Sequence, residues 1–437
     1  MVVGTIVGAS IFVQPSEVSS AVPTFGGMLL VWLAAGALTW FGASICAELS
    51  SAMPRTGGVY VFLNELFSPA IGFLWGWAMF WSMHSGIIAA IAMVFGRYAA
   101  TITPLGDVGV RLVAVAGIAA LSAINYVGVR PGSRVQTGLT IAKVAAILVL
   151  LVVLFAAGTP RVPPSTSAIS ARGFLRALVA GLFAFGGWHM VTYAAEETRD
   201  PERTIPRALM FGSAIVVVIY LSLNAAYLLV LPIDKVLAST HIAFDATAAT
   251  AGPSAASAIS VLVLVSSFGA MSGIILAGPR VYYAMAEDGL LFRWMGALHP
   301  RFRTPHLAIV VQGVWSSVLV LTGTYRTIMS RVVYTEWIFF GALALGTIAA
   351  RRSRAYAPRF RAAGFPIAPL LFAIVCLAIV TNQIASDPRD SLIGLGLVAA
   401  GLPVYYIWTR VPGSRFPVRH REPETGEPET GSLKPGT

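Results

Sequence analysis

The chain has few charged residues for its length. Asp, Glu, Lys and Arg make up 11% of its 437 residues, whereas they make up about a quarter of an average soluble domain. Hydrophobic residues reach 57%, and the mean hydropathy is +0.77. This balance excludes an ordinary soluble domain and indicates a polytopic membrane protein.

Cysteine is scarce, and motifs of enzymes and ATP-driven pumps are missing. Cys46 and Cys376 both fall in apolar runs, so we expect buried thiols rather than a disulfide. No G-x-x-x-x-G-K-[ST] motif occurs, which argues against ATP-driven transport within this chain. His84 and His189 have no second ligand at metal spacing, and no catalytic triad is evident. We therefore predict no enzymatic activity, no cofactor and no metal site.

Apolar runs recur from end to end, each long enough to cross a hydrocarbon core of about 30 Å. The ten-residue alternation of a membrane β-barrel is not seen. The sequence therefore predicts an all-α polytopic membrane protein with 12 transmembrane helices. The predicted spans are 2–22, 27–52, 69–100, 111–128, 135–158, 174–196, 208–231, 255–285, 306–324, 328–350, 366–385 and 391–409.

Basic residues are unevenly divided between the two sides that these spans create. Of 30 Lys and Arg residues, 20 fall on the side of the termini, 9 fall on the other side, and Lys143 lies within a span. Because basic residues are enriched in cytoplasmic loops, both termini are predicted to be cytoplasmic. The net charge of +11 is thus a topology signal, and no nucleic-acid partner is expected. No cleavable signal peptide precedes the first run, which suits a multi-pass protein of the bacterial inner membrane.

The chain is predicted to form one membrane domain, residues 1–409, followed by a tail. The tail, 410–437, contains the repeat "EPETGEPETG", which is acidic, rich in proline and without apolar residues to bury. We expect it to be disordered.

Two spans contain residues that interrupt a helix. "GTIVGASIFVQPSEV" (4–18) includes Gly8, and "FAFGGWHM" (183–190) has Gly186 and Gly187 in mid-span. Taken alone, each is compatible with close helix packing. They are, however, the first spans of two halves of five, and paired interruptions of this kind indicate a transporter site. Unwound backbone must face protein, water or a ligand, and half-helix ends suit the carboxylate and ammonium of an amino acid.

Four stretches resemble the amino acid–polyamine–organocation (APC) superfamily, and within it the L-type amino acid transporter branch and its bacterial relatives. The likeness covers essentially the whole chain. It implies a five-plus-five inverted-repeat (LeuT-like) fold with helices 1 and 6 broken and two extra helices, and transport by alternating access. Repeat one would cover about 1–158, repeat two about 174–350 and the extra helices 366–409. The four stretches are "GTIVGASIFVQP" (4–15), "AELSSAMPRTGGVYVFLNE" (47–65), "FAFGGWHMVTYAAEETRDPERTIPRAL" (183–209) and "GPRVYYAMAEDGLLFRWMGALHPRFRTP" (278–305).

The resemblance also implies which residues bind the substrate. In the family, backbone amides of the first break meet the substrate carboxylate, and carbonyls of both breaks meet its amine. The Phe183 ring would close over the substrate as a gate. Ser10 stands where the family usually has a second glycine, so its Cβ either favours a small substrate or weakens binding. The residues so implied are Ile6, Gly8, Ala9 and Ser10 in the first break and Phe183, Ala184 and Gly186 in the second.

Lys143 lies about 12 Å along the fifth span, 8 residues past Val135. A lysine at that depth costs roughly 2.5–3.5 kcal/mol. It could snorkel to the cytoplasmic surface, but the reach is long, so we favour a functional role. The resemblance agrees, because sodium-independent relatives carry a helix 5 lysine where sodium-coupled ones hold a cation. Lys143 therefore predicts sodium-independent exchange or proton symport.

Three acidic residues lie near the cytoplasmic edge, where structural ion pairs are favoured over proton relay. They are Glu48, Glu196 and Glu197, and the expected partners are Arg55 or the "RDPER" run, 199–203. Glu336 is deep or interfacial depending on where the tenth helix begins, and the sequence does not decide between these.

Trp188 and His189 follow the second break directly. Each either lines the pocket or gate or packs in the core, and we favour aromatic packing for Trp188 and a hydrogen-bonded core position for His189.

The substrate prediction follows from what the breaks contain. No carboxylate adjoins either break, so a small or neutral L-amino acid is favoured over a cationic amino acid or polyamine. A non-transporting amino acid sensor would bind the same ligand without uptake into proteoliposomes.

The first span also begins late. Met1 precedes Gly8 by 7 residues, about 10 Å of helix, whereas half the hydrocarbon core is about 15 Å. We therefore expect the natural amino terminus to extend further.

Overall fold

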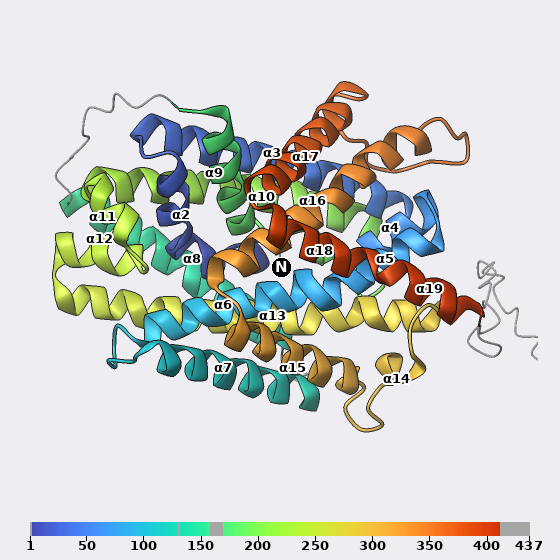
Figure 1. The fold of residues 1–437 in the computed structure, drawn as a ribbon, viewed down its shortest axis with the longest axis horizontal. Helices are drawn as coiled ribbons and strands as arrows, with labels where there is room; N and C mark the ends of the chain where they lie inside the picture. Colours follow the sequence, from blue (N-terminus) through green and yellow to red (C-terminus); the bar gives the residue numbers. More distant parts are fainter. Residues whose placement is uncertain (1, 129–131, 158–168, 411–437) are drawn as a thin grey trace, which may run out of the picture.

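The structure is a computed structural model that describes residues 2–128, 132–157 and 169–410 (Figure 1). Within these ranges the regular elements are all helical. Apart from Arg410, the predicted tail lies outside the described residues. In chain order the elements are α1 (Val2–Ile6), η1 (Ser10–Phe12), α2 (Gln14–Ala21), α3 (Phe25–Ala52), α4 (Val59–Leu66), α5 (Pro69–Ala78), η2 (Met79–Met83), α6 (His84–Ala99), α7 (Asp107–Val127), α8 (Gly132–Ala157), α9 (Ala171–Ala184), η3 (Trp188–Ala194), α10 (Pro201–Val230), α11 (Ile233–Ala238), α12 (Ile242–Ala251), α13 (Pro253–Glu287), α14 (Arg293–Gly296), α15 (His306–Thr322), α16 (Tyr325–Ala350), α17 (Ile367–Ser386), α18 (Pro388–Ala399) and α19 (Gly401–Arg410).

Most of these helices match the predicted spans. In the part of the chain that the structure describes, nine segments are long and apolar enough to cross a membrane. Two shorter apolar helices, Thr140–Ala156 and His306–Thr322, lie in the bundle with them. Every predicted span overlaps one of these segments or the broken segment α1–η1–α2. The prediction of an all-helical polytopic membrane protein is therefore confirmed.

The helices begin where the sequence supplies capping residues. The side chains of Thr24, Ser170 and Thr324 accept hydrogen bonds from backbone amides three residues on, at 3.1, 3.0 and 3.2 Å. Such caps satisfy amides that would otherwise lack partners in the first turn. Proline opens α5, α10, α13 and α18, where its missing N–H costs nothing.

The distribution of side chains is that of a membrane protein. Large apolar side chains such as Val108, Phe211 and Ile367 are more than two thirds exposed on the outside of the bundle. Polar side chains such as Gln312 and Glu48 are fully buried inside it. An apolar exterior is what lipid requires, and a polar interior is where transport sites lie.

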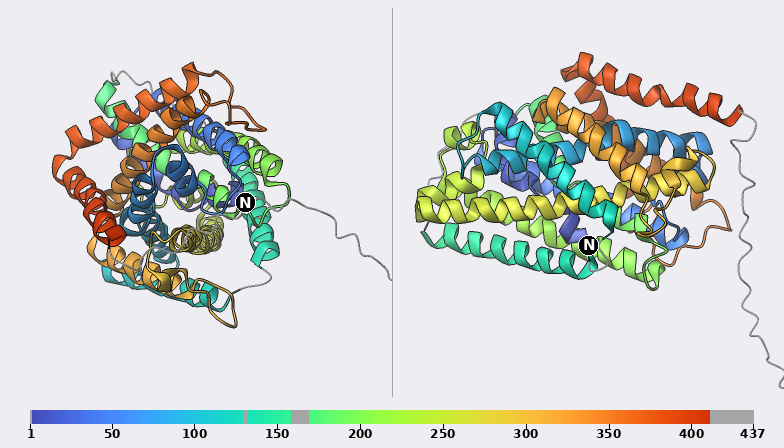
Figure 2. Two further views of the ribbon diagram at one scale, coloured as in Figure 1. Left: turned by 90° about the vertical axis from the view of Figure 1, so that its right-hand side faces the viewer. Right: turned by 90° about the horizontal axis from the view of Figure 1, so that it is seen from below.

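The two ends of the bundle are built differently. The short helices α11 and α12 lie at one end, and α4, α14 and the end of α19 lie at the opposite end (Figure 1). The 35-residue helix α13 runs between them. Seen along the long axis, the chain's first residues lie inside a ring of helices (Figure 2). The first broken segment is therefore enclosed by the bundle.

Candidate substrate site

The first break lies between α1 and α2. Helix α1 ends at Ile6, and the Gly8 amide turns back to donate to the Ile6 carbonyl at 2.7 Å. Ala9 precedes the short 3₁₀ helix η1 and is fully buried. Pro15 stands in the first turn of α2, so a second helix starts there.

The second break separates α9 from η3. The Gly186 amide donates to the Phe183 carbonyl at 3.0 Å, which ends α9 in a tight turn. Gly187 has φ +95°, a left-handed conformation that favours glycine. A Cβ at Gly187 would lie 3.3 Å from the Thr5 carbonyl oxygen, so glycine also permits the close approach of the two breaks.

The two breaks are joined by side-chain hydrogen bonds. The Thr5 hydroxyl lies 3.2 Å from the Gly187 carbonyl oxygen. The Tyr220 hydroxyl, from α10, lies 2.8 Å from the Ile6 carbonyl oxygen and 3.3 Å from that of Ala184. Sequence reasoning missed Tyr220, because one tyrosine in a long apolar span gives no signal of its direction. These bonds hold carbonyls of both breaks around a single hydroxyl.

Lys143 connects the first break to α8. Its ammonium donates to the carbonyl oxygens of Gly4 at 2.7 Å and Val7 at 2.8 Å. The residue is 6% exposed, and its head group points to α1 rather than to a membrane surface. A Cβ on Gly4 would lie 2.5 Å from the Thr140 hydroxyl, so this glycine allows α1 to lie against α8.

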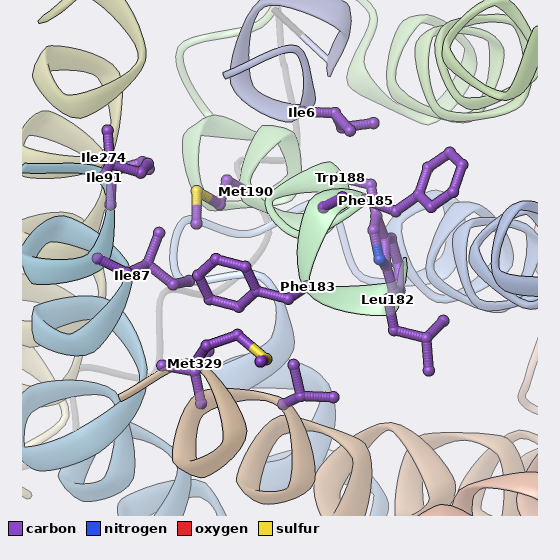
Figure 3. Close-up of a cluster of buried hydrophobic side chains, with 14 of the residues drawn as sticks. Ile6, Ile87, Ile91, Leu182, Phe183, Phe185, Trp188, Met190, Ile274 and Met329 are labelled. Carbon is purple, nitrogen blue, oxygen red and sulfur yellow. The ribbon is translucent and has the colours of Figure 1, made fainter. Parts of the chain in front are cut away.

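A small cavity lies between the two breaks. Its free volume is about 20 Å³, which is room for about one water molecule. Six of the seven residues that the resemblance implied line it, and Ala9 is packed behind them. The Phe183 ring points toward Ile87 of α6, and Phe185 and Trp188 point to the opposite side (Figure 3). The lining is Thr5, Ile6, Gly8, Ser10, Ile87, Ile91, Phe183, Ala184, Gly186, Gly187, Met190, Ile274, Val332 and Glu336.

A larger cavity, here called the vestibule, lies toward α11 and α12. Its volume is about 420 Å³, and Arg97, Arg111, His241 and Tyr325 are among its lining residues. The Tyr325 ring contacts Phe183 edge to face, with 6.2 Å between centroids. Since Phe183 lines the small cavity and Tyr325 lines the vestibule, this ring pair separates the two spaces.

His241, one of the residues that line the vestibule, pairs with Asp245. His241 Nδ1 lies 3.2 Å from Asp245 Oδ2. The hydrogen bond to Asp245 raises the pKa of His241 above its ordinary value.

The turn before α4 packs against η3. The Gly57 amide donates to the Tyr193 carbonyl at 3.3 Å. A Cβ on Gly58, at φ +50°, would lie 2.1 Å from the Thr192 hydroxyl, so only glycine fits against η3 there. The Tyr60 hydroxyl donates to Asp288 at 2.7 Å and so ties α4 to the end of α13.

Two of the three acidic residues at this end, Glu48 and Glu197, form ion pairs as expected, but with other partners. Glu48 is fully buried and accepts two hydrogen bonds from the Arg351 guanidinium, one of them at 2.7 Å. The Ala362 amide donates to the same carboxylate at 2.8 Å. Glu197 pairs with Arg280 at 2.8 Å. The expected pairing with Arg55 or residues 199–203 is therefore wrong for these two.

Trp188 and His189 lie behind the cavity and are not among its lining residues. Their rings pack against Phe340, Trp188 tilted at a centroid distance of 4.9 Å and His189 edge-on at 5.2 Å. Both His189 nitrogens are buried without a hydrogen-bond partner in the described part of the chain. The expected aromatic packing of Trp188 is seen, and the expected hydrogen bond of His189 is not.

Glu336 was left undecided by the sequence, and the structure places it in the cavity wall. It lies inside α16 and is 4% exposed. Sequence reasoning had found no carboxylate beside either break, because α16 is separated from both breaks in the chain and is buried on several sides.

Comparisons of the sequence with known proteins identify the family. A sequence model of the family described as "Amino acid permease" matches residues 1–403. The cystine/glutamate transporter of Homo sapiens is 29% identical over 428 residues, covering 94% of this chain and 84% of that protein. The serine/threonine exchanger SteT of Bacillus subtilis (strain 168) is 30% identical over 413 residues, covering 93% and 94%. The b(0,+)-type amino acid transporter 1 of Homo sapiens is 28% identical over 419 residues, covering 93% and 86%. Two broken helices around a closed cavity, and a family match over most of its length, place the chain in the amino acid permease family of the APC superfamily.

Proposed function

We propose that the protein exchanges small neutral L-amino acids across the bacterial cytoplasmic membrane, without sodium, by alternating access. The chain's family moves amino acids and is not a family of enzymes. What the proposal adds is the substrate class, the absence of sodium coupling and the route through the protein.

The contact of Lys143 with the first break carries the sodium-independent part of the proposal. Its ammonium satisfies the carbonyl oxygens of Gly4 and Val7, oxygen ligands of the kind that a cation would need. A fixed positive charge at this place repels sodium. The protein then needs no bound ion to hold α1 against α8.

The size and polarity of the cavity support a small neutral substrate. Apart from Glu336, its side chains are uncharged, and the closed space is small enough that a large substrate would require large outward movements. The substrate carboxylate would meet the amides of Ala9 and Ser10, and its amine would meet carbonyls of Ile6, Phe183 and Ala184. The similarity to a serine/threonine exchanger supports the same class.

The proposed route uses a fold of twelve crossings. α1–η1–α2 through α8 would form one repeat and α9–η3 through α16 the inverted second, with α17 and α18–α19 outside them. Both termini would be cytoplasmic, so α4 and α14 mark the inner end and the vestibule opens outward. The alternative is a cationic amino acid or polyamine exchanger, because the Glu336 carboxyl lines the cavity and would suit a cationic substrate.

Counterflow in proteoliposomes tests the proposal. Vesicles loaded with one unlabelled amino acid should take up labelled neutral amino acids, and the rate should be the same in sodium and in choline buffer. A rate that requires sodium would refute the role of Lys143. If only arginine or putrescine is exchanged, the substrate class is cationic rather than neutral. Binding without uptake of any of the twenty amino acids would identify a sensor.

A further inference from the structure

Glu336 is the one carboxyl that lines the cavity among the residues the structure describes. It is 4% exposed, and its Oε1 is buried without a hydrogen-bond partner. No ion pair to Glu336 occurs in the described ranges. The side chain therefore faces the substrate space with no cation beside it.

The apolar side chains around Glu336 and the exclusion of water disfavour a negative charge on it while the cavity is closed. Ile87, Ile91, Met190 and Val332 line the same space. The cavity has room for about one water, so a carboxylate there loses nearly all its hydration. An ionised carboxylate at this depth without a partner is strongly disfavoured.

Titratable and charged groups on the neighbouring elements do not supply that partner. Tyr193 lies within electrostatic reach of Glu336, but a phenol is neutral near pH 7. His84 and His189 are fully buried, with ring nitrogens that make no hydrogen bond in the described part of the chain. Cys46 on α3 and Cys376 on α17 are buried thiols. Other groups already have partners of their own: Tyr60 is hydrogen-bonded to Asp288, Glu65 to Arg55, Glu48 to Arg351 and Asp390 to Arg331. Arg97, Arg172 and Arg176 lie toward the vestibule end.

We propose that Glu336 must bind a proton each time the cavity closes, so that one proton travels with the amino acid in either direction. The inference rests on the proposed exchange function and specifies its co-substrate. In the open states water reaches the cavity, and the Glu336 carboxylate takes a proton from the side that is open. The carboxyl O–H persists through closure and is lost to the water of the other side.

This mechanism makes exchange depend on pH at both membrane faces. The carboxylate of a neutral amino acid does not titrate between about pH 5.5 and 8.5, and the Glu336→Gln variant controls for titration of the substrate amine near the alkaline end. In the proposed mechanism the occupancy of Glu336 by a proton sets the rate, and the rate falls as pH rises on either side. Equal exchange in both directions moves no net proton.

Counterflow of the fastest neutral amino acid, measured from pH 5.5 to 8.5, tests the proposal. For the unmodified protein we expect the rate to fall at least fivefold across the range, including when only one side is made alkaline. Glu336→Gln has nearly the shape of the protonated acid and should exchange at a rate that varies less than twofold. Glu202→Gln, which removes a surface partner of Arg359, should keep the full pH dependence.

Each other outcome counts against the inference. A pH-independent rate in the unmodified protein refutes it and leaves the exchange function standing. A Glu336→Gln variant that still responds to pH assigns the titration to another group, such as His84 or His189. If arginine exchange is lost in Glu336→Gln while neutral exchange never responds to pH, Glu336 recognises a cationic substrate instead.

If Glu336→Gln does not fold, as judged by its melting curve, Glu336→Asp replaces it. An unshifted pH midpoint in Glu336→Asp then refutes the role. Absence of any amino acid counterflow at every pH refutes the exchange function itself.

Discussion

The rings of Phe183 and Tyr325 meet edge to face between the closed cavity and the vestibule, with their centroids 6.2 Å apart. Gln14 donates to the Tyr325 hydroxyl at 3.0 Å, and the Arg97 guanidinium lies 5.2 Å from the ring centre. Tyr325 is therefore held from several sides, and Phe183 belongs to the second break. A movement of that break would separate the rings and open the cavity to the vestibule.

Replacing Phe183 by Ala should open this barrier, because it removes one of the two rings that meet between the cavities. In a background with both cysteines replaced by Ala, a Ser10→Cys thiol reports access to the cavity. We expect a membrane-impermeant thiol reagent added from the vestibule side to label Ser10→Cys at least fivefold faster when Phe183→Ala is present. Phe183→Leu should give an intermediate rate. Equal labelling rates in all three would show that the ring pair is not the barrier.

Replacing Lys143 by Met should impair both folding and transport. The Met side chain has similar length but cannot donate to the Gly4 and Val7 carbonyl oxygens, and each buried unpaired group costs about 1–3 kcal/mol. We expect a lower melting temperature and at least a tenfold loss of counterflow. The exposed Lys235 on α11 supplies the control, since Lys235→Met should change neither. Full transport by Lys143→Met would remove the proposed role.

Replacing Tyr220 by Phe should lower the stability of the folded protein and increase its affinity for the substrate. The Ile6 carbonyl oxygen accepts from the Gly8 amide at 2.7 Å and from Tyr220 at 2.8 Å, which occupies both of its lone pairs. The substrate amine can use this oxygen only by displacing one donor. Without the hydroxyl we expect a stability loss of about 1 kcal/mol and an apparent KM about fivefold lower.

The Tyr227 hydroxyl offers the matched control for this prediction. It lies on the same helix, is buried and has no hydrogen-bond partner in the described residues. Tyr227→Phe should therefore leave KM unchanged and should not destabilise the protein. A KM that rises in Tyr220→Phe would show that the hydroxyl binds the substrate rather than competing with it.

The sequence predicted those features that are local to one segment. Each apolar run is a property of its own residues, so the positions of the helices followed directly, and Gly8 and Gly186–Gly187 marked the two breaks. The depth of Lys143 was likewise readable from its distance along one helix. These features needed no knowledge of neighbouring segments.

Features that depend on how helices face each other were not predictable. Tyr220 and Glu336 point into the site only because α10 and α16 are rotated by packing against other helices. The partner of Glu48, Arg351, is 303 residues away in sequence, and nearer arginines were equally plausible from the chain alone. The π-helical turn η2 in the third span also gave no sequence signal.

Breaking the Glu48–Arg351 pair should cost stability and leave the pH dependence of exchange intact. Glu48 is fully buried, so Glu48→Gln leaves the Arg351 charge without its partner, which costs about 3–5 kcal/mol in comparable buried pairs. Melting curves should show that Arg351→Gln added to Glu48→Gln recovers part of the loss. Glu65→Gln removes a half-exposed pair with Arg55 and should cost less than about 1 kcal/mol. A change in the pH profile of Glu48→Gln would instead make Glu48 a proton-binding group.

The His241–Asp245 pair should make the stability of the vestibule end depend on pH. The pKa of His241 is raised by its hydrogen bond to Asp245, so the folded protein binds the proton more tightly than the unfolded chain. The resulting stabilisation is fully present below the unfolded pKa of about 6.5 and is lost as pH rises through the folded pKa. Burial raises the pKa of Asp245, but hydrogen bonds from His241 and Ser239 outweigh it and hold that pKa below its ordinary value. Asp245 therefore stays ionised throughout this window.

Because the His241 and Asp245 side chains are about one third exposed, the effect on stability should be at most about 1 kcal/mol. Melting temperatures measured at pH 6 and pH 8 should fall more in the unmodified protein than in His241→Gln. Equal falls in the two proteins would show that this pair does not stabilise the fold.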